Sequence, residues 1–324
     1  MGKSLSFITP SGRVTLGNYI GALSQWTAAP GNVYAVADLH GITTPWNPET
    51  LRTYIIEIAS VLIALGLDQN QSIVYIQSQV AAHAEMAWLL ECVGHMGEFQ
   101  RMTQFKAKGR GRGDISVGLF TYPALMAGDI LLHDVDTVPV GEDQKQHVEL
   151  TRDLAIRVNH LFGPVFTVPE PKVPTVGARV RSLKNPNEKM SKSVIDDGTV
   201  LLLESPDSIH RKFMAAVTDS GREVHYDPVE KPGISNLLEI YAALAKEPLD
   251  DIVARYRTAG YGTFKRKVAE VVIESTKSVR ESALALQTNS EEILNRLQQG
   301  RQEAWSTTNA KLQQVKRAMG FWLP

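Results

Sequence analysis

Short apolar runs alternate with helical patterns through the first half of the chain. The apolar runs predict β-strands over residues 5–9, 33–37, 73–77 and 137–140. Between them, apolar residues recur at helical spacing over residues 50–65 and 82–92. This alternation is typical of an α/β fold, in which helices cover both faces of a parallel sheet.

Polar residues follow several of the predicted strands, namely Thr9-Pro10, Asp38-Leu39-His40 and Gly141-Glu142-Asp143. In a parallel sheet, ligands bind beyond the carboxyl ends of the strands. We therefore expect a binding site at that edge of the sheet. A lone histidine such as His40 is nevertheless more often structural than catalytic.

Strand signals disappear after Thr199. Helical patterns cover residues 205–217, 234–246, 262–287 and 290–319, with Gly or Pro breaks between them. The pattern predicts an α/β domain over residues 1–200 and an all-helical domain over residues 201–324. The last helix of the second domain can pack back on the first.

The composition is that of an ordinary globular protein, with 43% hydrophobic and 21% charged residues among 324. A net charge of −1 gives little general attraction for polyanions, so any contact with RNA must come from local basic patches. The single cysteine, Cys92, excludes a disulfide framework. Neither a secretion signal nor a membrane span is recognisable, and we expect a cytoplasmic protein with neither membrane nor DNA as a partner.

The segment Lys189-Met190-Ser191-Lys192-Ser193 holds two ammonium groups and two hydroxyls within five residues. Asn and Pro precede it, and Asp and Gly follow it, which is typical of a loop. Lysine is a compact charge on a long stem and suits a phosphate chain. Most short Lys/Ser runs are solvated basic loops, so the interpretation depends on a second motif.

A second motif lies near the N-terminus, where an apolar run ends at Pro10-Ser11-Gly12 and a helical pattern begins around Asn18. A strand–turn–helix unit places backbone N–H groups at a helix N-terminus, where anions bind. Thr15 and Asn18 can present a hydroxyl and an amide on one side of the first turn, and Gly17 admits a flat nucleobase. Alternatively, Thr15 is a helix cap and Gly-Asn a turn.

The run from Tyr122 to Leu132 is mostly apolar and contains one carboxylate, Asp129. As a helix, it places Tyr122, Met126 and Asp129 on one face. A carboxylate on an apolar face must find a donor, and indole offers one N–H and no acceptor. Asp129 is therefore a candidate indole acceptor, although an aspartate that pairs with a basic neighbour or faces water has the same spacing.

Two further segments carry polar groups. Residues 141–146 open a predicted helix in which Asp143 can accept from ribose hydroxyls and Gln144 from an ammonium group, although acidic residues are common in first turns. Residues 106–113 interleave basic residues with glycines and could close over a triphosphate, although most such loops are solvated. Metal-ligand spacing, a nucleophile elbow and a Walker loop are all lacking, so no protein-held metal is expected.

The lysine segment resembles the signature of class I aminoacyl-tRNA synthetases, and Thr15-Leu16-Gly17-Asn18 resembles the variant of the His-Ile-Gly-His motif in tryptophanyl-tRNA synthetases. Similar segments continue over residues 38–43, 101–106, 122–131, 138–147, 177–180, 217–220 and 232–237. The chain thus resembles bacterial tryptophanyl-tRNA synthetases over essentially its whole length. The resemblance implies a Rossmann-like catalytic domain with a dimer interface over residues 1–200 and an anticodon-binding helical domain over residues 201–324.

Carried over position by position, the resemblance implies three groups of site residues. The catalytic group is Lys189, Lys192, Lys108, Thr15 and Asn18. The ATP-binding group is Thr9, Pro10, Ser11, Gly17, Asn18, Gly141, Glu142, Asp143, Val180, Lys189, Met190, Ser191, Lys192 and Ser193. The tryptophan-binding group is Asp129, Tyr122, Met126, Gln144, Val138, Val140 and His40.

The implied activity is that of a homodimeric tryptophan–tRNA ligase, which uses ATP with Mg²⁺ to activate L-tryptophan and then loads tRNA(Trp). A tyrosine-specific sister enzyme is one alternative, because it would share the fold and both ATP motifs. A non-catalytic paralogue that binds RNA or senses tryptophan is another. A small nucleotidyltransferase would not explain the helical second half.

Three positions depart from the family pattern. Phe7 stands in place of a glycine, and Thr9 stands in place of a glutamine that lies near the substrate carboxylate and phosphate. Leu39 occupies a position where glutamine is frequent. The contacts to the substrate carboxylate are therefore the part of the resemblance with the least support, and we expect an altered response to inhibitors that mimic tryptophan.

Overall fold

The computed structural model describes residues 3–109, 115–172, 180–192 and 196–323, without the side chains of residues 107–109 and Asp143. The chain forms two compact units. The first combines Met1–Pro10, Ala28–Thr175 and Ser290–Pro324. The second combines Ser11–Thr27 and Val176–Asn289. Each unit is therefore built from segments that are distant in sequence.

The strands of the described chain lie in the first unit and form parallel pairs. They are β1 (Leu5–Ile8), β2 (Val33–Val36), β3 (Ile73–Ile76), β4 (Thr137–Pro139) and β5 (Glu170–Lys172). One sheet has the order β1-β2-β3 with Ala35 opposite Phe7 and Tyr75, and a second sheet pairs β4 with β5. β4 contacts β1. The predicted α/β, Rossmann-like class is confirmed, whereas β5, a short Glu-Pro-Lys strand, carried no apolar signal.

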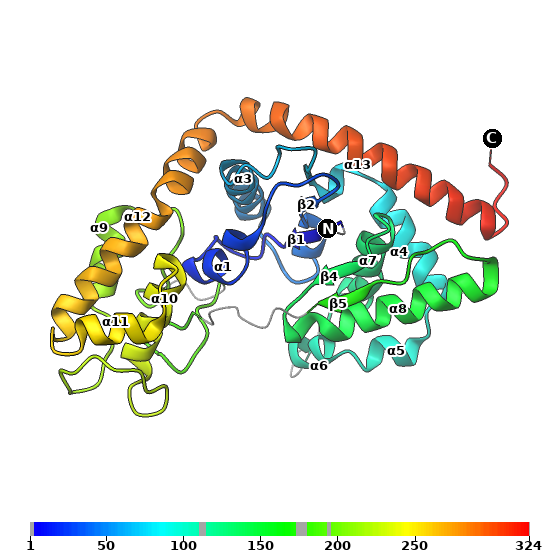
Figure 1. Ribbon diagram of the computed structural model, residues 1–324. Coiled ribbons are helices and arrows are strands. Elements are labelled where there is room, and N and C mark those ends of the chain that lie inside the picture. Colours follow the sequence, from blue (N-terminus) through cyan, green and yellow to red (C-terminus); the bar gives the residue numbers. More distant parts are fainter. Residues whose placement is uncertain (1–2, 110–114, 173–179, 193–195, 324) are drawn as a thin grey trace. The chain divides into compact units, whose positions relative to one another are not determined.

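Helices surround these strands. In the first unit they are α2 (Asp38–Gly41), α3 (Pro48–Ala64), the 3₁₀ turn η2 (Gln77–Gln79), α4 (Ala82–Val93), α5 (Met96–Gln100), α6 (Thr103–Gly109), α7 (Val117–Leu131), α8 (Glu142–Phe162) and α13 (Ser290–Ala318). α7 packs between α4 and α8 (Figure 1). Local signals set the helix starts: Asn47 caps α3 and Ser116 caps α7, each by accepting a backbone N–H bond.

The last helix, α13, packs on the sheet of the first unit (Figure 1). It contacts β3, α3 and α4. Arg296 forms two hydrogen bonds of 2.7 and 2.8 Å with Asp68, and Lys311 lies 2.6 Å from a carboxylate oxygen of Asp134. Gly300 faces β3 so closely that a Cβ atom there would lie 2.2 Å from the Val74 carbonyl oxygen.

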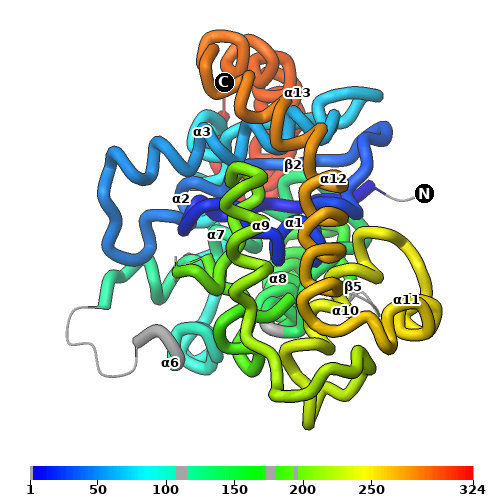
Figure 2. The backbone as a smooth tube through the Cα atoms, turned by 90° about the vertical axis from the view of Figure 1, so that its left-hand side faces the viewer, coloured from blue at the N-terminus to red at the C-terminus, as the bar shows by residue number. Residues whose placement is uncertain are grey.

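The second unit is helical. Its elements are α1 (Leu16–Gly21), the 3₁₀ turn η1 (Leu23–Gln25), α9 (Pro206–Met214), α10 (Pro232–Ala245), α11 (Leu249–Tyr256) and α12 (Tyr261–Gln287). α12 packs against α9 and α10 (Figure 2). Phe213 of α9 and Phe264 of α12 are fully buried in the core cluster of this unit. The helices predicted over 50–65, 82–92, 205–217, 234–246, 262–287 and 290–319 all form, with bounds within three residues.

The functional division at residue 200 stays a prediction. By packing, residues 11–27 and 176–199 belong with the helices of the second unit, and α13 belongs with the sheet of the first. The amphipathic pattern of α13 would be the same whether the helix packed on the sheet or on other helices. Such a pattern shows that one face is buried and does not show what covers that face.

Replacing Gly300 with alanine should destabilise the protein by about 1–3 kcal/mol, because the added methyl group would overlap the main chain of β3. Thermal unfolding of the Gly300→Ala protein measures the effect. Gly262→Ala in α12 is the matched control, since a Cβ atom there has no neighbour within 4 Å. Equal melting temperatures for the two variants would contradict the close packing of α13 on β3.

Candidate active site

Thr15-Leu16-Gly17-Asn18 and the lysine segment both belong to the second unit, and backbone hydrogen bonds pair residues 14–16 with residues 200–202, which follow the lysine segment. The Leu16 N–H donates to the Val200 carbonyl and the Leu202 N–H donates to the Val14 carbonyl, each at 2.8 Å. Within the lysine segment, the Met190 N–H donates to the Val180 carbonyl at 3.1 Å. The chain therefore brings the N-terminal motif and the lysine segment together.

Glycines border the lysine segment closely. A Cβ atom on Gly12 would lie 2.6 Å from the Lys192 carbonyl oxygen, so only glycine allows this approach. A Cβ atom on Gly17 would meet Met190 and Val180 at ordinary contact distances of 3.6 Å. Packing therefore requires the glycine at position 12, whereas a Cβ atom at position 17 would make only ordinary contacts.

Thr15 and Asn18 form the first turn of α1. The Asn18 N–H donates to the Thr15 hydroxyl at 3.2 Å, and the Thr15 N–H donates to the Asn18 side-chain oxygen at 3.1 Å. This is a capping box, so Thr15, which is fully buried, is the helix cap that the sequence allowed as the alternative. The other part of that alternative is wrong, because Gly17 and Asn18 lie inside α1 and not in a turn.

Asn236 clamps the stem of the lysine segment. Its side-chain oxygen accepts from the Arg181 N–H at 2.9 Å, and its side-chain NH₂ donates to the Arg181 carbonyl at 3.1 Å. Arg181 in turn forms an antiparallel bridge with Lys189. The side-chain amide of Asn236, a buried residue of α10, thus pairs with the Arg181 backbone as a neighbouring strand would. The sequence did not predict this role, because the two residues are 55 positions apart.

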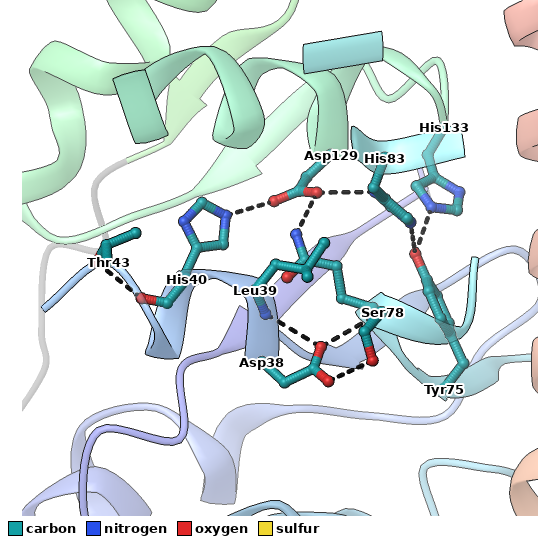
Figure 3. A network of polar contacts seen from close by, with 10 residues as sticks. Asp38, Leu39, His40, Thr43, Tyr75, Ser78, His83, Asp129 and His133 are labelled. Atoms are coloured by element: carbon teal, nitrogen blue, oxygen red, sulfur yellow. Dashed lines mark hydrogen bonds and ion pairs between the residues drawn. The ribbon is translucent and has the colours of Figure 1, made fainter. Parts of the chain in front are cut away.

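Asp129 lies on α7 in the first unit and is almost fully buried. Its Oδ1 atom accepts from Gln77 Nε2 at 2.6 Å and from His83 Nδ1 at 2.8 Å, and its Oδ2 atom lies 2.8 Å from His40 Nε2 (Figure 3). Burial by itself would raise the pKa of Asp129, but the hydrogen bonds from His40 and His83 outweigh it and lower that pKa to about 2. Asp129 is therefore an anion that only accepts hydrogen bonds.

The strand ends deliver the partners of Asp129. His40 belongs to the short helix α2 that follows β2, and Gln77 directly follows β3. Asp38 holds these two strand ends together by accepting from the Ser78 N–H at 2.9 Å and from the Ser78 hydroxyl at 2.5 Å (Figure 3). The sequence predicted His40 at this edge. It did not predict Gln77 and His83, whose only signal is their position just after a strand.

The other predicted tryptophan-binding residues lie around α7 and the edge of the sheet. Tyr122 lies on the Asp129 helix, and its hydroxyl oxygen lies 2.5 Å from His147 Nε2. Met126 and Val140 are partly buried against the core, and Val138 is buried. Gln144 lies in the first turn of α8. The predicted apolar face with Tyr122, Met126 and Asp129 on one helix is confirmed, whereas the contacts of these residues with tryptophan stay predictions.

The residues predicted to bind ATP or to act in catalysis are found in both units of the chain. Those of the first unit are Thr9, Pro10, Gly141, Glu142 and Asp143, and those of the second are Ser11, Thr15, Gly17, Asn18, Val180 and residues 189–193. Ser193 lies outside the described residues, as do the side chains of Lys108 and Asp143. Among the described residues, no group of three or more His, Cys, Asp or Glu is placed to hold a metal ion.

Phe7 and Thr9 stand on either side of the last residue of β1. The Phe7 ring meets the rings of Tyr75, His83 and His133 edge-on, with centroid distances of 6.0, 5.9 and 6.4 Å. Phe7, which stands where the family has a glycine, therefore packs against the aromatic and imidazole rings that lie behind Asp129. Within the described chain, no helix is long and apolar enough to cross a membrane.

The fold and these motifs define a class I aminoacyl-tRNA synthetase. The chain belongs to that family, because the family model for class I tRNA synthetases of the W and Y type matches residues 3–277. Within the class it is most like enzymes for tryptophan. It is 46% identical to the tryptophan–tRNA ligase of Caldanaerobacter subterraneus over 100% of this chain and 99% of that protein. It is 45% identical to the tryptophan–tRNA ligase of Bacillus subtilis over 98% and 97% of the two chains.

Solved structures agree with this assignment. The tryptophanyl-tRNA synthetase of Campylobacter jejuni, in a complex with ADP and tryptophan, superposes with a TM-score of 0.85 at 31% identity. The match covers 98% of this chain and 100% of that one. The tryptophanyl-tRNA synthetase of Mycoplasma pneumoniae superposes with a TM-score of 0.83 at 32% identity over 99% and 98% of the chains.

The lowered pKa of Asp129 makes folding stability depend on pH. As the pH falls, the carboxyl of the unfolded chain, with a pKa near its ordinary 3.8, binds a proton at a higher pH than the folded one does. Asp129 therefore stabilises the fold fully above about pH 4, and this contribution is lost as the pH falls toward 2. The full contribution is about 2 kcal/mol. Urea unfolding of wild type and Asp129→Asn should show a difference in unfolding free energy that shrinks by about 1 kcal/mol between pH 6 and pH 3. A difference that stays constant would contradict the low pKa.

Proposed function

We propose that this protein activates L-tryptophan with ATP and transfers it to tRNA(Trp), using the residues described above. The chain is a tryptophan–tRNA ligase. The observation that carries the tryptophan site is the buried, anionic Asp129 on the apolar face of α7. In the same chain, residues 14–16 of the N-terminal motif pair through their backbone with residues 200–202, which follow the lysine segment.

The acceptor count at Asp129 fits indole. A carboxylate has about four acceptor positions, and Gln77, His83 and His40 use three of them. One position is left for a single N–H donor, and indole brings one donor and no acceptor. Gln77 Oε1 is also buried and has no hydrogen-bond partner among the described atoms, so the pocket has a second acceptor for a donor of the substrate or for water.

The reaction has two steps. The tryptophan carboxylate attacks the α-phosphate of ATP, a new P–O bond forms, and pyrophosphate leaves with the electrons of the broken P–O bond. A terminal ribose hydroxyl of the tRNA then attacks the acyl carbon of tryptophanyl-adenylate, loses its proton, and releases AMP. Neither step uses a protein nucleophile, so positioning of the reactants and stabilisation of phosphate charge supply the rate.

The charged and polar groups of the ATP motifs have separate tasks in this proposal. Lys189, Lys192 and Lys108 neutralise the charge that builds on the leaving pyrophosphate. Asn18 uses its oxygen in the capping box, and its NH₂ group is the kind of donor that phosphate oxygens need. Asp143 accepts from the ribose hydroxyls, and Mg²⁺ enters with ATP as its metal complex.

We also propose a homodimer in the cytoplasm, with the helical segments after residue 200 reading the anticodon. Exposed apolar side chains in the first unit support the dimer. Trp88 on α4 is 64% exposed, and Ile156 and Leu161 on α8 are exposed as well. α4 and α8 contact each other, so their outer residues are available for one interface.

Tryptophan-dependent exchange between ATP and pyrophosphate tests the first step directly. The chain should catalyse the exchange with tryptophan and should not do so with the other amino acids. Aminoacylation of total tRNA with each amino acid tests the second step, and tryptophan alone should be loaded. Tight tryptophan binding without exchange would instead identify a non-catalytic sensor.

Replacing Lys192 with alanine should lower the rate of tryptophan activation by about 10²–10³-fold, because a charge that stabilises the transition state is lost. Tryptophan affinity should change by less than about twofold, since this lysine is assigned to the phosphates and not to the amino acid. Lys184→Ala is the matched control, because Lys184 is an exposed lysine of the same unit that pairs with Asp197 at 2.8 Å. Equal exchange rates for the two variants would remove Lys192 from the proposal.

Replacing Asp129 with alanine should reduce the preference for tryptophan over phenylalanine at least about a hundredfold, since a site built around a polar partner can discriminate by 10⁴–10⁵-fold. The ratio of kcat/KM values for the two amino acids in the exchange assay measures the preference. The KM for ATP is the internal control and should stay near the wild-type value. An unchanged ratio would show that Asp129 does not select the substrate.

A further inference from the structure

Behind Asp129, a chain of hydrogen bonds continues away from the substrate side (Figure 3). His83, whose Nδ1 atom contacts Asp129, places its Nε2 atom 2.9 Å from the Tyr75 hydroxyl oxygen. The same hydroxyl oxygen lies 2.9 Å from His133 Nε2. We call His133, Tyr75 and His83 the relay. Tyr75 and His83 are fully buried, so the relay has almost no water to compete with its bonds.

When the His83 ring is neutral, the negative charge of Asp129 fixes the direction of every bond in the relay. An anionic carboxylate only accepts, so His83 must carry its proton on Nδ1, and in a neutral ring its Nε2 atom then accepts. The Tyr75 hydroxyl must therefore donate its single proton to His83. Its oxygen accepts in turn, so His133 must carry a proton on Nε2. One charge at the substrate end thus selects one tautomer for each of two histidines.

The electrostatics of the relay agree with this direction. Burial lowers the pKa of His133 to about 3, so that its ring is neutral at physiological pH. Burial and the negative charge of Asp129 raise the pKa of Tyr75 well above its ordinary value, so that the hydroxyl keeps its proton. Each link therefore has one proton to give and one lone pair to receive.

Packing holds the relay in place. The Phe7 ring meets all three relay rings edge-on, and Tyr75 stacks on His83 with an angle of 26° between the ring planes. The outer end of the relay, His133, lines a cavity of about 350 Å³ at the start of β2 and β3. The relay thus runs from that cavity, near the start of the strands, to Asp129 near their carboxyl ends.

We propose that Tyr75 and His133 are positioning residues for indole recognition, acting through His83 on Asp129. The relay holds His83 with its Nδ1–H toward Oδ1, so that Oδ2 keeps an acceptor position for the indole N–H. This inference rests on the proposed tryptophan activity. It assigns selectivity to groups two and three hydrogen bonds behind the carboxylate, where they have no contact with the substrate.

A substrate pair that differs only in the indole N–H tests this role. In 3-benzothienylalanine a sulfur atom replaces the N–H of tryptophan, so the ratio of the two kcat/KM values in ATP–pyrophosphate exchange reports the N–H contact alone. Tyr75→Phe should lower this ratio at least about tenfold, chiefly through a higher KM for tryptophan, and leave the KM for ATP unchanged. A general loss of structure would lower kcat/KM equally for both substrates and leave their ratio unchanged.

Matched variants separate the relay from simple burial. Tyr34→Phe is the control, because Tyr34 is a buried tyrosine on the neighbouring strand and its hydroxyl accepts from Asn32 Nδ2 at 3.3 Å. His133→Leu removes the outer donor and should lower the ratio, whereas His133→Gln keeps an N–H donor and should restore much of it. The proposal would be overturned if the ratio of kcat/KM values for tryptophan and 3-benzothienylalanine differed less than twofold between the Tyr75→Phe and Tyr34→Phe proteins.

The histidine tautomers give a second measurement that does not depend on activity or on any variant. In ¹⁵N NMR spectra of the wild-type protein, His83 should be neutral with its proton on Nδ1, and His133 should be neutral with its proton on Nε2. The opposite tautomer at His83 would refute the relay. A wild-type chain without tryptophan-dependent exchange would instead refute the proposed function, and the tautomers would still decide the direction of the relay.

Discussion

A buried negative charge cannot be left without donors, and this constraint organises the substrate side of the molecule. Asp129 lies in an apolar helix face, and each element around it contributes one donor: α2 gives His40, the residue after β3 gives Gln77, and α4 gives His83. The donors lower the pKa of the carboxyl although burial would raise it. The result is a buried carboxylate that accepts hydrogen bonds at any physiological pH, which suits a ligand with a lone N–H.

A different interaction organises the phosphate side. The lysine segment carries charge on long side chains, but the residues before and after it are held in place. Asn236 holds Arg181, and residues 200–202 pair through their backbone with residues 14–16. Met190, in the middle of the segment, is buried, which anchors the lysines on either side of it. Fixed backbone and adjustable side chains together suit a ligand whose charge is redistributed during the reaction.

Local sequence signals predicted much of this protein because they reflect local physics. The strands β1 to β4 and the long helices follow from apolar periodicity, and the caps at Asn47 and Ser116 mark helix starts. Asp129 stood out as a carboxylate on an apolar face. The same signals could not show β5, which has three residues and no apolar pattern, or the short helix α11. The departure at Phe7 was visible, but its packing partners were not.

The sequence by itself therefore determined the α/β class, the helical second half, the two motifs predicted to bind ATP and the carboxylate proposed to select tryptophan. Only the tertiary structure decided what those groups touch. His83, Tyr75 and His133 form a directed chain because three separate elements place them within hydrogen-bonding distance, and Asn236 reaches Arg181 across 55 residues. Periodicity records which face of an element is buried, whereas the partner on that face depends on how distant segments pack, and no local pattern encodes that.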